Sequence, residues 1–145
     1  GNHRLAFDKS GNLWIGKTHI KWAGDEGLKK ITWNKKKPLI ATGVSLTKDG
    51  FKITFNRPLK ENPKLKLSRH TYHYHEAYGS PKVDLKNVDP TNSQLSSDGK
   101  TLTITLSEIT ARRLYTIELK GTTDIQGLPL MGNILRYNVV KTRPK

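Results

Sequence analysis

Residues 96–106 read SSDGKTLTITL, and this stretch sets the expectation for the fold. Residues 96–99 have the composition of a tight turn, because Asp accepts hydrogen bonds from nearby backbone groups and Gly tolerates a positive φ. Beyond the turn, Leu102, Ile104 and Leu106 alternate with threonines, which is the two-residue period of a strand with one buried face. The stretch therefore predicts a half-buried β-strand.

The same alternation recurs on both sides of this strand. No stretch of the chain carries a sustained helical period, apart from one expected helical turn at residues 108–112. Strands are also expected at 39–46 and 65–74, whereas residues 80–94 are expected to be mostly loop, with a short edge strand at most. Short strands separated by turns predict an all-β sandwich. Its two sheets should bury Phe51, Ile53, Phe55, Leu102, Ile104, Leu106, Tyr115, Ile117, Leu119, Leu135 and Tyr137.

The N-terminal part of the chain has a different pattern. Residues 5–16 read LAFDKSGNLWIG, in which two short apolar segments flank a turn that begins at Asp8. This pattern predicts a β-hairpin. Residues 34–38 are charged and end in Pro38, so they suit a linker better than a strand or helix interior. We therefore expect an N-terminal segment at 1–37 and a sandwich at 38–145.

Composition excludes several classes of protein. The chain has 145 residues, no cysteine and a net charge of +14. Disulfides, thiol nucleophiles and cysteine zinc sites are excluded, and no apolar run approaches the ~20 residues of a membrane span. The charge favours polyanions, although it comes mostly from lysine, which also serves solubility. Arginine is sparse and no recognition helix is evident, so no specific nucleic-acid partner is predicted. The chain does not begin with Met, and we expect it to belong to a longer protein.

No catalytic motif is recognisable. The sequence lacks GxSxG, HExxH and a glycine-rich phosphate loop. The aspartates Asp8, Asp49, Asp98 and Asp124 lie in turns, where such residues cap local backbone groups. We therefore predict no catalytic residue, no cofactor and no enzymatic activity for this chain.

The densest cluster of rings is RHTYHYHEAYGSP at residues 69–81. On a strand, His73 and His75 would share one face, and two such histidines can bind zinc or copper if a third ligand is near. His3, His19 and an acidic residue are candidates for that ligand. In the alternative, which needs no third ligand, the neighbouring tyrosines pack inward and both histidines are solvated. We predict no metal site, and His73 and His75 are the pair that a titration should test.

The tyrosines of this stretch have two interpretations. Exposed tyrosines beside lysines form a stacking platform for sugars or bases. Buried tyrosines with a hydrogen-bonded hydroxyl group are common in cores, and the alternation of the strand places Tyr72 and Tyr74 inward. The residues of a binding platform would be Tyr72, Tyr74, Tyr78, Trp22 and Lys52.

The order of these motifs resembles a known family. It runs from LAFDKSGNLWIG and GLKKITW through DGFKITFNRPL, YHYHEAYGSP and SSDGKTLTITL to RRLYTIELKG and LRYNV. It resembles the C-terminal region of large bacterial secreted proteins that carry a β-propeller of the quinoprotein glucose or sorbosone dehydrogenase kind. The resemblance implies that residues 5–33 are the last propeller strands and that 44–140 form an immunoglobulin-like domain. The catalytic residues of such a propeller would lie upstream.

The resemblance implies a non-catalytic accessory module at the C-terminus of a secreted, periplasmic or cell-surface protein, with the upstream propeller as its partner. The expected fold is then an immunoglobulin-like antiparallel β-sandwich with an N-terminal β-hairpin extension. The alternative function is a glycan- or polyanion-binding module that uses the basic surface and the aromatic residues.

Overall fold

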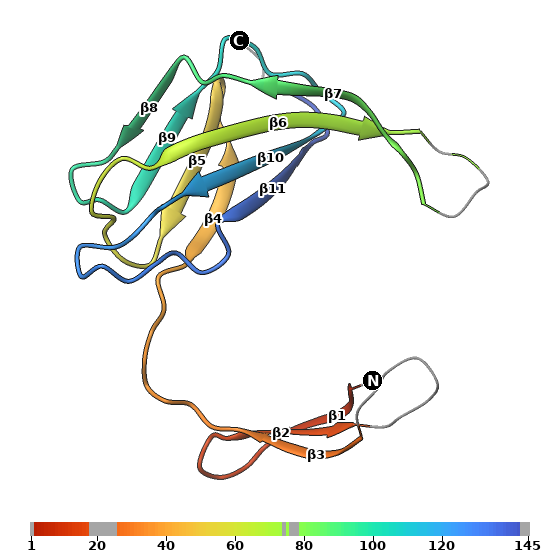
Figure 1. Cartoon of the computed structure of the whole chain (residues 1–145), viewed down its shortest axis with the longest axis vertical. Helices are drawn as coiled ribbons and strands as arrows, with labels where there is room; N and C mark the ends of the chain where they lie inside the picture. Colours follow the sequence, from red (N-terminus) through yellow and green to blue (C-terminus); the bar gives the residue numbers. More distant parts are fainter. Residues whose placement is uncertain (1, 18–25, 74, 76–78, 143–145) are drawn as a thin grey trace. The chain divides into compact units, whose positions relative to one another are not determined.

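The computed structural model describes residues 2–17, 26–73, 75 and 79–142, without the side chains of residues 2 and 3. The chain divides into two compact units, Gly1–Lys37 and Pro38–Lys145, and the division falls in the charged segment before Pro38. The described residues form β-strands and no helix (Figure 1). The strands are β1 (Asn2–Phe7), β2 (Leu13–Lys17), β3 (Gly27–Ile31), β4 (Ala41–Leu46), β5 (Gly50–Phe55), β6 (Lys64–Tyr72), β7 (Lys82–Val88), β8 (Asn92–Leu95), β9 (Thr101–Thr105), β10 (Arg113–Lys120) and β11 (Ile134–Val139).

The first unit is a single antiparallel sheet in the order β1-β2-β3. The predicted hairpin is confirmed, and β3 extends it by pairing with β2. Residues directly opposite one another in a sheet point to the same side. The pairs Leu5–Ile15 and Phe7–Leu13 therefore share a face, and Ile31 joins them from β3. This face is mainly apolar, with Lys29 opposite Ile15, and Phe7 is 75% exposed.

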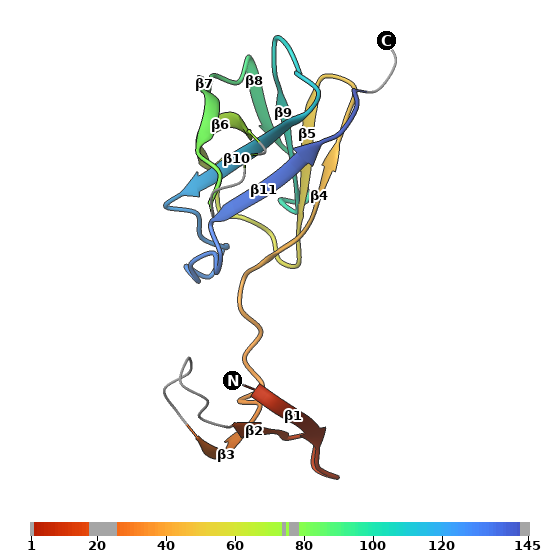
Figure 2. The ribbon, with the colours of Figure 1, turned by 90° about the vertical axis from the view of Figure 1, so that its right-hand side faces the viewer.

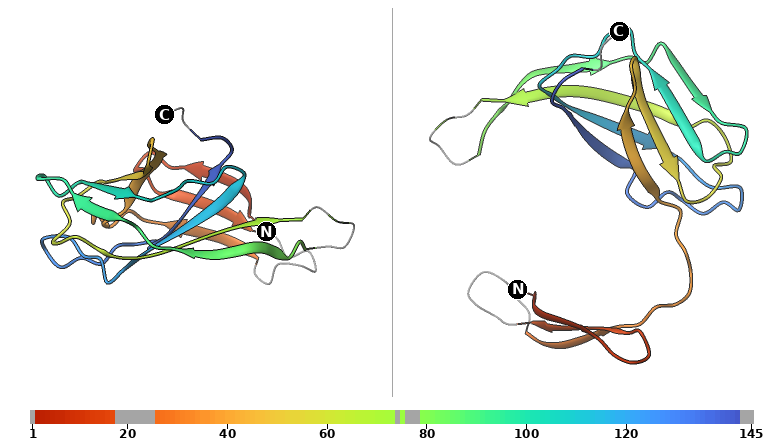
Figure 3. Two further views of the ribbon diagram at one scale, coloured as in Figure 1. Left: turned by 90° about the horizontal axis from the view of Figure 1, so that it is seen from above. Right: turned by 180° about the vertical axis from the view of Figure 1, so that it is seen from behind.

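The second unit is a sandwich of two four-stranded antiparallel sheets (Figures 2 and 3). One sheet has the order β4-β5-β9-β8 and the other has the order β11-β10-β6-β7. In chain order these are the ABED sheet of an immunoglobulin fold and its GFC sheet with one added strand beside C. The predicted immunoglobulin-like β-sandwich is therefore confirmed.

The predicted core is confirmed for most of its members. Phe51, Ile53, Leu102, Ile104 and Ile117 are completely buried between the sheets, whereas two predicted members on β11 are only partly buried. The Phe51 ring lies 5.2 Å from the Tyr115 ring, a distance that suits a stabilising aromatic pair. The partly buried residues are Leu135 and Tyr137.

Tyr115 also fixes the turn that leads into its own strand. The backbone N–H of Thr110 donates a 3.0 Å hydrogen bond to the Tyr115 hydroxyl, five residues further along. Many immunoglobulin-like domains carry a tyrosine near the start of strand F, which corresponds to β10 here. The hydroxyl group of that tyrosine bonds the backbone a few residues upstream. The buried ring and the bonded hydroxyl together hold the connection between β9 and β10 against the core.

Two expectations for the sandwich were wrong. The edge strand expected within residues 80–94 is present as β7, but with the start of β8 it leaves less loop there than expected, and residues 108–112 form no helical turn. Strand β7 lacks a clean alternation because its pairing with β6 shifts between Arg69 and Thr71. Asp84 lies at this bulge with φ 52°, so the extra residue there interrupts the two-residue period.

Candidate functional site

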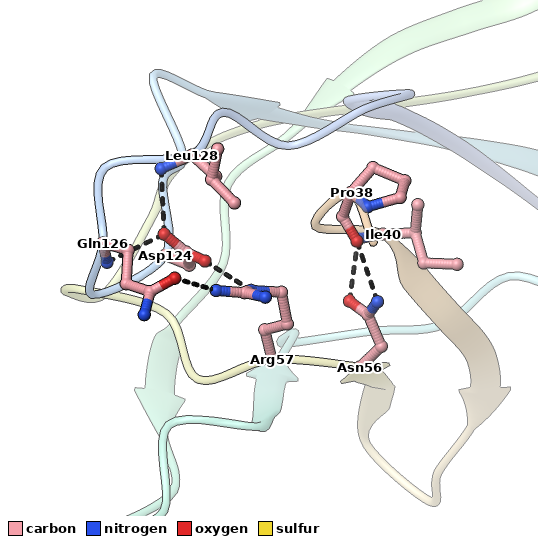
Figure 4. Close-up of polar contacts among 7 residues, drawn as sticks. All are labelled: Pro38, Ile40, Asn56, Arg57, Asp124, Gln126 and Leu128. Carbon is pink, nitrogen blue, oxygen red and sulfur yellow. Dashed lines mark hydrogen bonds and ion pairs between the residues drawn. The ribbon is translucent and has the colours of Figure 1, made fainter. Parts of the chain in front are cut away.

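A polar junction of the sandwich lies where residues 38–40 enter it (Figure 4). The side chain of Asn56, at the end of β5, donates to the Pro38 carbonyl at 2.8 Å and accepts from the Ile40 N–H at 2.9 Å. The Asn56 N–H also donates to the Ile40 carbonyl at 3.2 Å. One asparagine therefore bonds both Pro38 and Ile40 and fixes the path of the chain.

The same segment is also held by the opposite sheet. Leu39 is completely buried and forms a parallel bridge with Leu130. The Met131 N–H donates to the Leu39 carbonyl at 2.9 Å, three residues before β11 begins. The entering chain is thus bonded to the end of β5 in one sheet and to the approach to β11 in the other.

Arg57, the residue after Asn56, forms an ion pair with a buried carboxylate beside this junction. Arg57 donates through Nε to the Asp124 carboxylate at 2.5 Å, and Asp124 is completely buried (Figure 4). Arg57 also donates to the Gln126 side chain. Burial raises the pKa of Asp124, but the N–H groups of Leu128 and Gln126 and the guanidinium group together outweigh it and hold the pKa below its usual range. A lowered pKa means that folding stabilises the charged carboxylate.

The ring-rich stretch folds differently from the interpretation in which its tyrosines pack inward. Leu65 and Leu67 face the core, so the residues of the other parity in β6 point outward. The prediction that Tyr72 packs inward is wrong, because its side chain is 48% exposed. His70, on the same outer face, is 2% exposed instead.

His70 and Tyr72 form a local pair. The Nε2 atom of His70 lies 3.1 Å from the Tyr72 hydroxyl, and the rings meet edge to face with centroids 5.0 Å apart. Burial lowers the pKa of His70, and the charges of Lys82 and Arg136 lower it further. His70 is therefore held neutral, with its Nδ1 atom unpaired among the described residues.

The histidine pair singled out for a metal titration lies beyond the end of β6. His73 and His75 are both exposed, and the strand alternation that placed them on one face stops at Tyr72. No group of three or more metal-binding side chains is found within the described residues. His19 and the side chain of His3, the histidines proposed as third ligands, lie outside that part of the chain.

The predicted aromatic platform is covered only in part by the structure. Tyr74, Tyr78 and Trp22 lie outside the described residues. Lys52 is exposed on β5, in the sheet β4-β5-β9-β8, whereas Tyr72 ends β6 in the other sheet. The structure therefore does not bring Lys52 and Tyr72 together.

The outer faces of the two sheets differ in charge. In the sheet β11-β10-β6-β7, the outward-facing strand residues include five cations, and Glu118 is the single acidic residue among them in these four described strands. In the other sheet, Lys52 is the single charged residue among those facing outward, and hydroxyl and amide groups surround it. The five cations are Lys64, Lys66, Lys82, Lys120 and Arg136.

Sequence reasoning missed the junction residues and this distribution of charge. Asn56 and Arg57 belong to the motif DGFKITFNRPL, which contributed to the family resemblance but was given no role of its own. Polar residues between a strand and Pro58 were the available signal, since the backbone there needs partners that a sheet no longer supplies.

Comparisons with known proteins give a fold neighbour and no family. Neither a family model nor a curated protein matches the chain. A crystal structure of the S-layer protein rSbsC is similar over 75% of this chain, with a TM-score of 0.53 and 22% identity. A structure of domains 1–6 of the surface layer protein SbsC matches 70% of this chain at 25% identity, with a TM-score of 0.48. The chain spans 14% of either of those chains, and the likeness concerns the fold alone.

Within the described residues, no helix is long and apolar enough to cross a membrane.

Proposed function

We propose that this chain is a non-catalytic structural module of a longer protein, in which the sandwich connects the segments before and after it. The observation that carries the proposal is the junction at Pro38–Ile40, where both sheets bond the entering chain. Within the sandwich, β11 ends at the pole opposite this junction (Figure 2). A tension applied along the chain then passes through the whole length of the sandwich.

The proposed location is the cell surface or the extracellular space. The fold neighbour is part of an S-layer protein, and the matched region is 14% of that chain, as one module of a longer protein would be. This likeness supports the location and the structural role as parts of the proposal. The absence of cysteine is compatible with either an exported or an internal protein.

The finer proposal is that the first unit completes an upstream β-propeller of the sugar-dehydrogenase kind. Propeller blades are four-stranded sheets, and the first unit has three paired strands. Support comes from the antiparallel order β1-β2-β3 and from the apolar face that carries Leu5 and Phe7. A sheet with such a face needs a second layer to bury it.

The structural role is tested by pulling the sandwich between Pro38 and Lys141 in a single-molecule force experiment. We expect one cooperative unfolding event, because both sheets must separate together when the junction is loaded. Asn56→Ala removes two side-chain hydrogen bonds to residues 38–40 and should lower the unfolding force. The control is Asn92→Ala on β8, whose side chain bonds only the adjacent Ser93 N–H.

The proposal is overturned if unfolding begins without a resolvable force, or if Asn56→Ala and Asn92→Ala change the force equally.

The competing enzymatic role is tested separately. The isolated chain, supplied with glucose and a soluble quinone cofactor, should show no turnover. A parent protein with residues 38–145 removed should keep its catalytic rate if the sandwich is structural.

A further inference from the structure

Two lysines of the sandwich lie directly opposite one another on neighbouring strands. Lys64 begins β6 and is the register partner of Lys120, which ends β10. Like charges in directly opposite positions of a sheet repel each other and destabilise the pairing. Both side chains are exposed, and neither forms an ion pair with any described residue. The repulsion between the two lysines therefore destabilises the folded chain, and a bound anion would remove that repulsion.

The two lysines also line one cleft. Its volume is about 260 Å³, and it lies between the turn before β6 and the turn after β10. This is smaller than the ~300–1,000 Å³ of pockets that hold drug-sized ligands, so it suits one charged group on a larger molecule. The lining residues are Glu61, Asn62, Pro63, Lys64, Lys120, Gly121, Thr122 and Thr123.

Thr122 supplies a second, independent indication of a ligand. The residue is 7% exposed, and its hydroxyl group has no hydrogen-bond partner within the described residues. A buried hydroxyl group without a partner destabilises the folded state, and native proteins rarely leave one unsatisfied. Thr122 lines this cleft and the adjacent hollow beside Pro129 and Asn133, and a ligand oxygen or a water molecule that reaches its hydroxyl group from the cleft would provide the missing partner.

The positive charge continues away from the cleft along β6. Lys66 follows Lys64 on the outer side, and Arg136 and Lys82 extend the charge towards Tyr72. From Lys64 to Tyr72 the outer row covers eight residue steps, or roughly 26 Å. Glu118 lies opposite Lys66, so the charge is concentrated at the cleft and at the other end of the row. An extended anionic chain fits this distribution better than a compact anion.

We propose that this face binds an acidic polysaccharide, with one carboxylate between Lys64 and Lys120 and the polymer lying along β6. Four of the five cations are lysines, which act as point charges and do not require a bidentate anion. Exposed Tyr72 offers a ring on which a sugar can stack. Glu61, in the cleft wall, repels anions and so weakens the attraction of the two lysines. The cleft therefore suits one anionic group. This binding role adds to the structural role proposed above and does not depend on it.

The test uses the whole chain and oligomers of polygalacturonate, titrated calorimetrically at low and at physiological salt. The double variant Lys64→Gln, Lys120→Gln should weaken binding by about tenfold or more, since two direct charge contacts are lost. The matched control is Lys52→Gln, Lys100→Gln, which lowers the net charge equally but changes exposed lysines outside the cleft. We expect less than about a threefold effect from the control.

Two single variants distinguish the cleft from general charge. Glu61→Gln should strengthen binding a few-fold, because it removes the negative charge beside the bound carboxylate. Thr122→Val keeps the shape of the side chain and removes the unpaired hydroxyl group. It should raise the melting temperature of the free protein while weakening polygalacturonate binding, and a purely structural hydroxyl group would not produce both changes.

Several outcomes overturn the proposal. They are absence of binding at low salt, equal losses in the two double variants, or binding to neutral dextran that matches binding to polygalacturonate. Tighter binding to single-stranded DNA than to polygalacturonate would identify a nucleic-acid surface instead. A persistent difference between the double variants, with polygalacturonate preferred, supports the cleft.

Discussion

Two turns in different units of this chain have the same backbone design and different surroundings. Asp8 and Asp124 both begin a D-x-x-G-x sequence. In each turn, the carboxylate accepts hydrogen bonds from the N–H groups two and four residues later, at 2.8–2.9 Å. In each, the glycine three residues later has φ near +80° and donates to the aspartate carbonyl. The local sequence alone therefore builds this turn in both places.

The second carboxylate oxygen shows where the two turns differ. In the first unit, the other oxygen of Asp8 accepts from Asn12 and from the Trp14 indole, both within six residues. In the sandwich, the corresponding oxygen of Asp124 accepts from Arg57, which is 67 residues away in the sequence, and Asp124 is completely buried. The same turn is a local cap in one unit and a tertiary connection in the other.

The largest expected effect comes from breaking the tertiary version of the turn. Asp124→Ala leaves Arg57 without its buried partner and two backbone N–H groups without acceptors. We expect the melting temperature of the sandwich to fall by more than about 10 °C. All five tyrosines follow residue 38 and all three tryptophans precede it, so tyrosine fluorescence reports on the sandwich.

The control for this variant is Asp98→Ala. Asp98 caps the turn before β9 through Ser96 and Lys100, and its side chain is exposed. Its loss should cost a few degrees at most. Similar losses for Asp98→Ala and Asp124→Ala would mean that burial and the ion pair add nothing to the turn.

Acid should weaken the sandwich through the same carboxylate. The pKa of Asp124 is lower in the folded chain than its ordinary value of 3.8. The charged form is favoured by folding, so its stabilisation is present above pH 3.8 and is lost as the pH falls through the folded value. Urea unfolding followed by tyrosine fluorescence between pH 5 and pH 2 should show this loss.

Asp124→Asn carries no charge and should reduce the acid-induced loss. The remaining slope belongs to Asp84, whose pKa is lowered by its hydrogen bond from Arg113, and to Asp98, whose pKa is lowered by its hydrogen bond from Ser96. An unchanged slope in Asp124→Asn would contradict the assignment of this stabilisation to Asp124.

Smaller and equal effects are expected from the glycines of the two turns. A Cβ atom added at Gly11 or at Gly127 would meet no atom within 4 Å, and their φ angles are +77° and +80°. Each Gly→Ala change should therefore cost only the strain of the left-handed backbone, about 1–2 kcal/mol. Denaturant unfolding is followed by tryptophan emission for Gly11→Ala and by tyrosine emission for Gly127→Ala.

A contrasting glycine provides the control. At Gly50 an added Cβ atom would lie 1.8 Å from the Ile104 carbonyl oxygen, so Gly50→Ala must move the backbone of β5 or β9. It should cost clearly more than either turn glycine. If Gly11→Ala and Gly127→Ala differ by more than about 1 kcal/mol, the tertiary surroundings act on the turn backbone as well as on its side chain.

The smallest effect is expected from breaking the local version of the turn. Asp8→Ala removes the acceptor of the Trp14 indole N–H, which lies 3.0 Å from the carboxylate. The indole resonance of Trp14 should shift in a nitrogen–proton correlation spectrum, while those of Trp22 and Trp33 move little. Lys9→Ala, at an exposed position in the same turn, is the control. A shift of equal size in Lys9→Ala would show that the change does not come from the hydrogen bond.

The ring-rich stretch at residues 69–81 shows which features of β6 can be predicted from the alternation of its residues. The alternation of β6 was predicted, but the face that points inward was assigned from Tyr72 instead of from the leucines. Leu65 and Leu67 have one parity, and Lys64, Lys66 and Tyr72 have the other, so the sequence held the information needed for the correct assignment. The burial of His70 on the outer face did not follow from parity, because it depends on the Tyr72 ring and on neighbours from other strands.

The candidate sites were less predictable than the strands. The linker before Pro38 could be recognised from its charge and its proline, whereas the bonds from Asn56 and Met131 that hold residues 38–40 join segments far apart in the chain. The same holds for Lys64 and Lys120, which become neighbours only through the pairing of β6 with β10.

By itself, the sequence determined the strands with a regular two-residue period, the turns at Asp8, Asp98 and Asp124, and most members of the core. These features depend on contacts within a few residues and on the separation of apolar from polar side chains, and both are written in residue order. The tertiary structure alone decided that Asp124 is buried against Arg57 whereas Asp8 bonds only its neighbours. It also decided that two lysines share a cleft, because strand pairing brings together charges that the sequence keeps 56 positions apart.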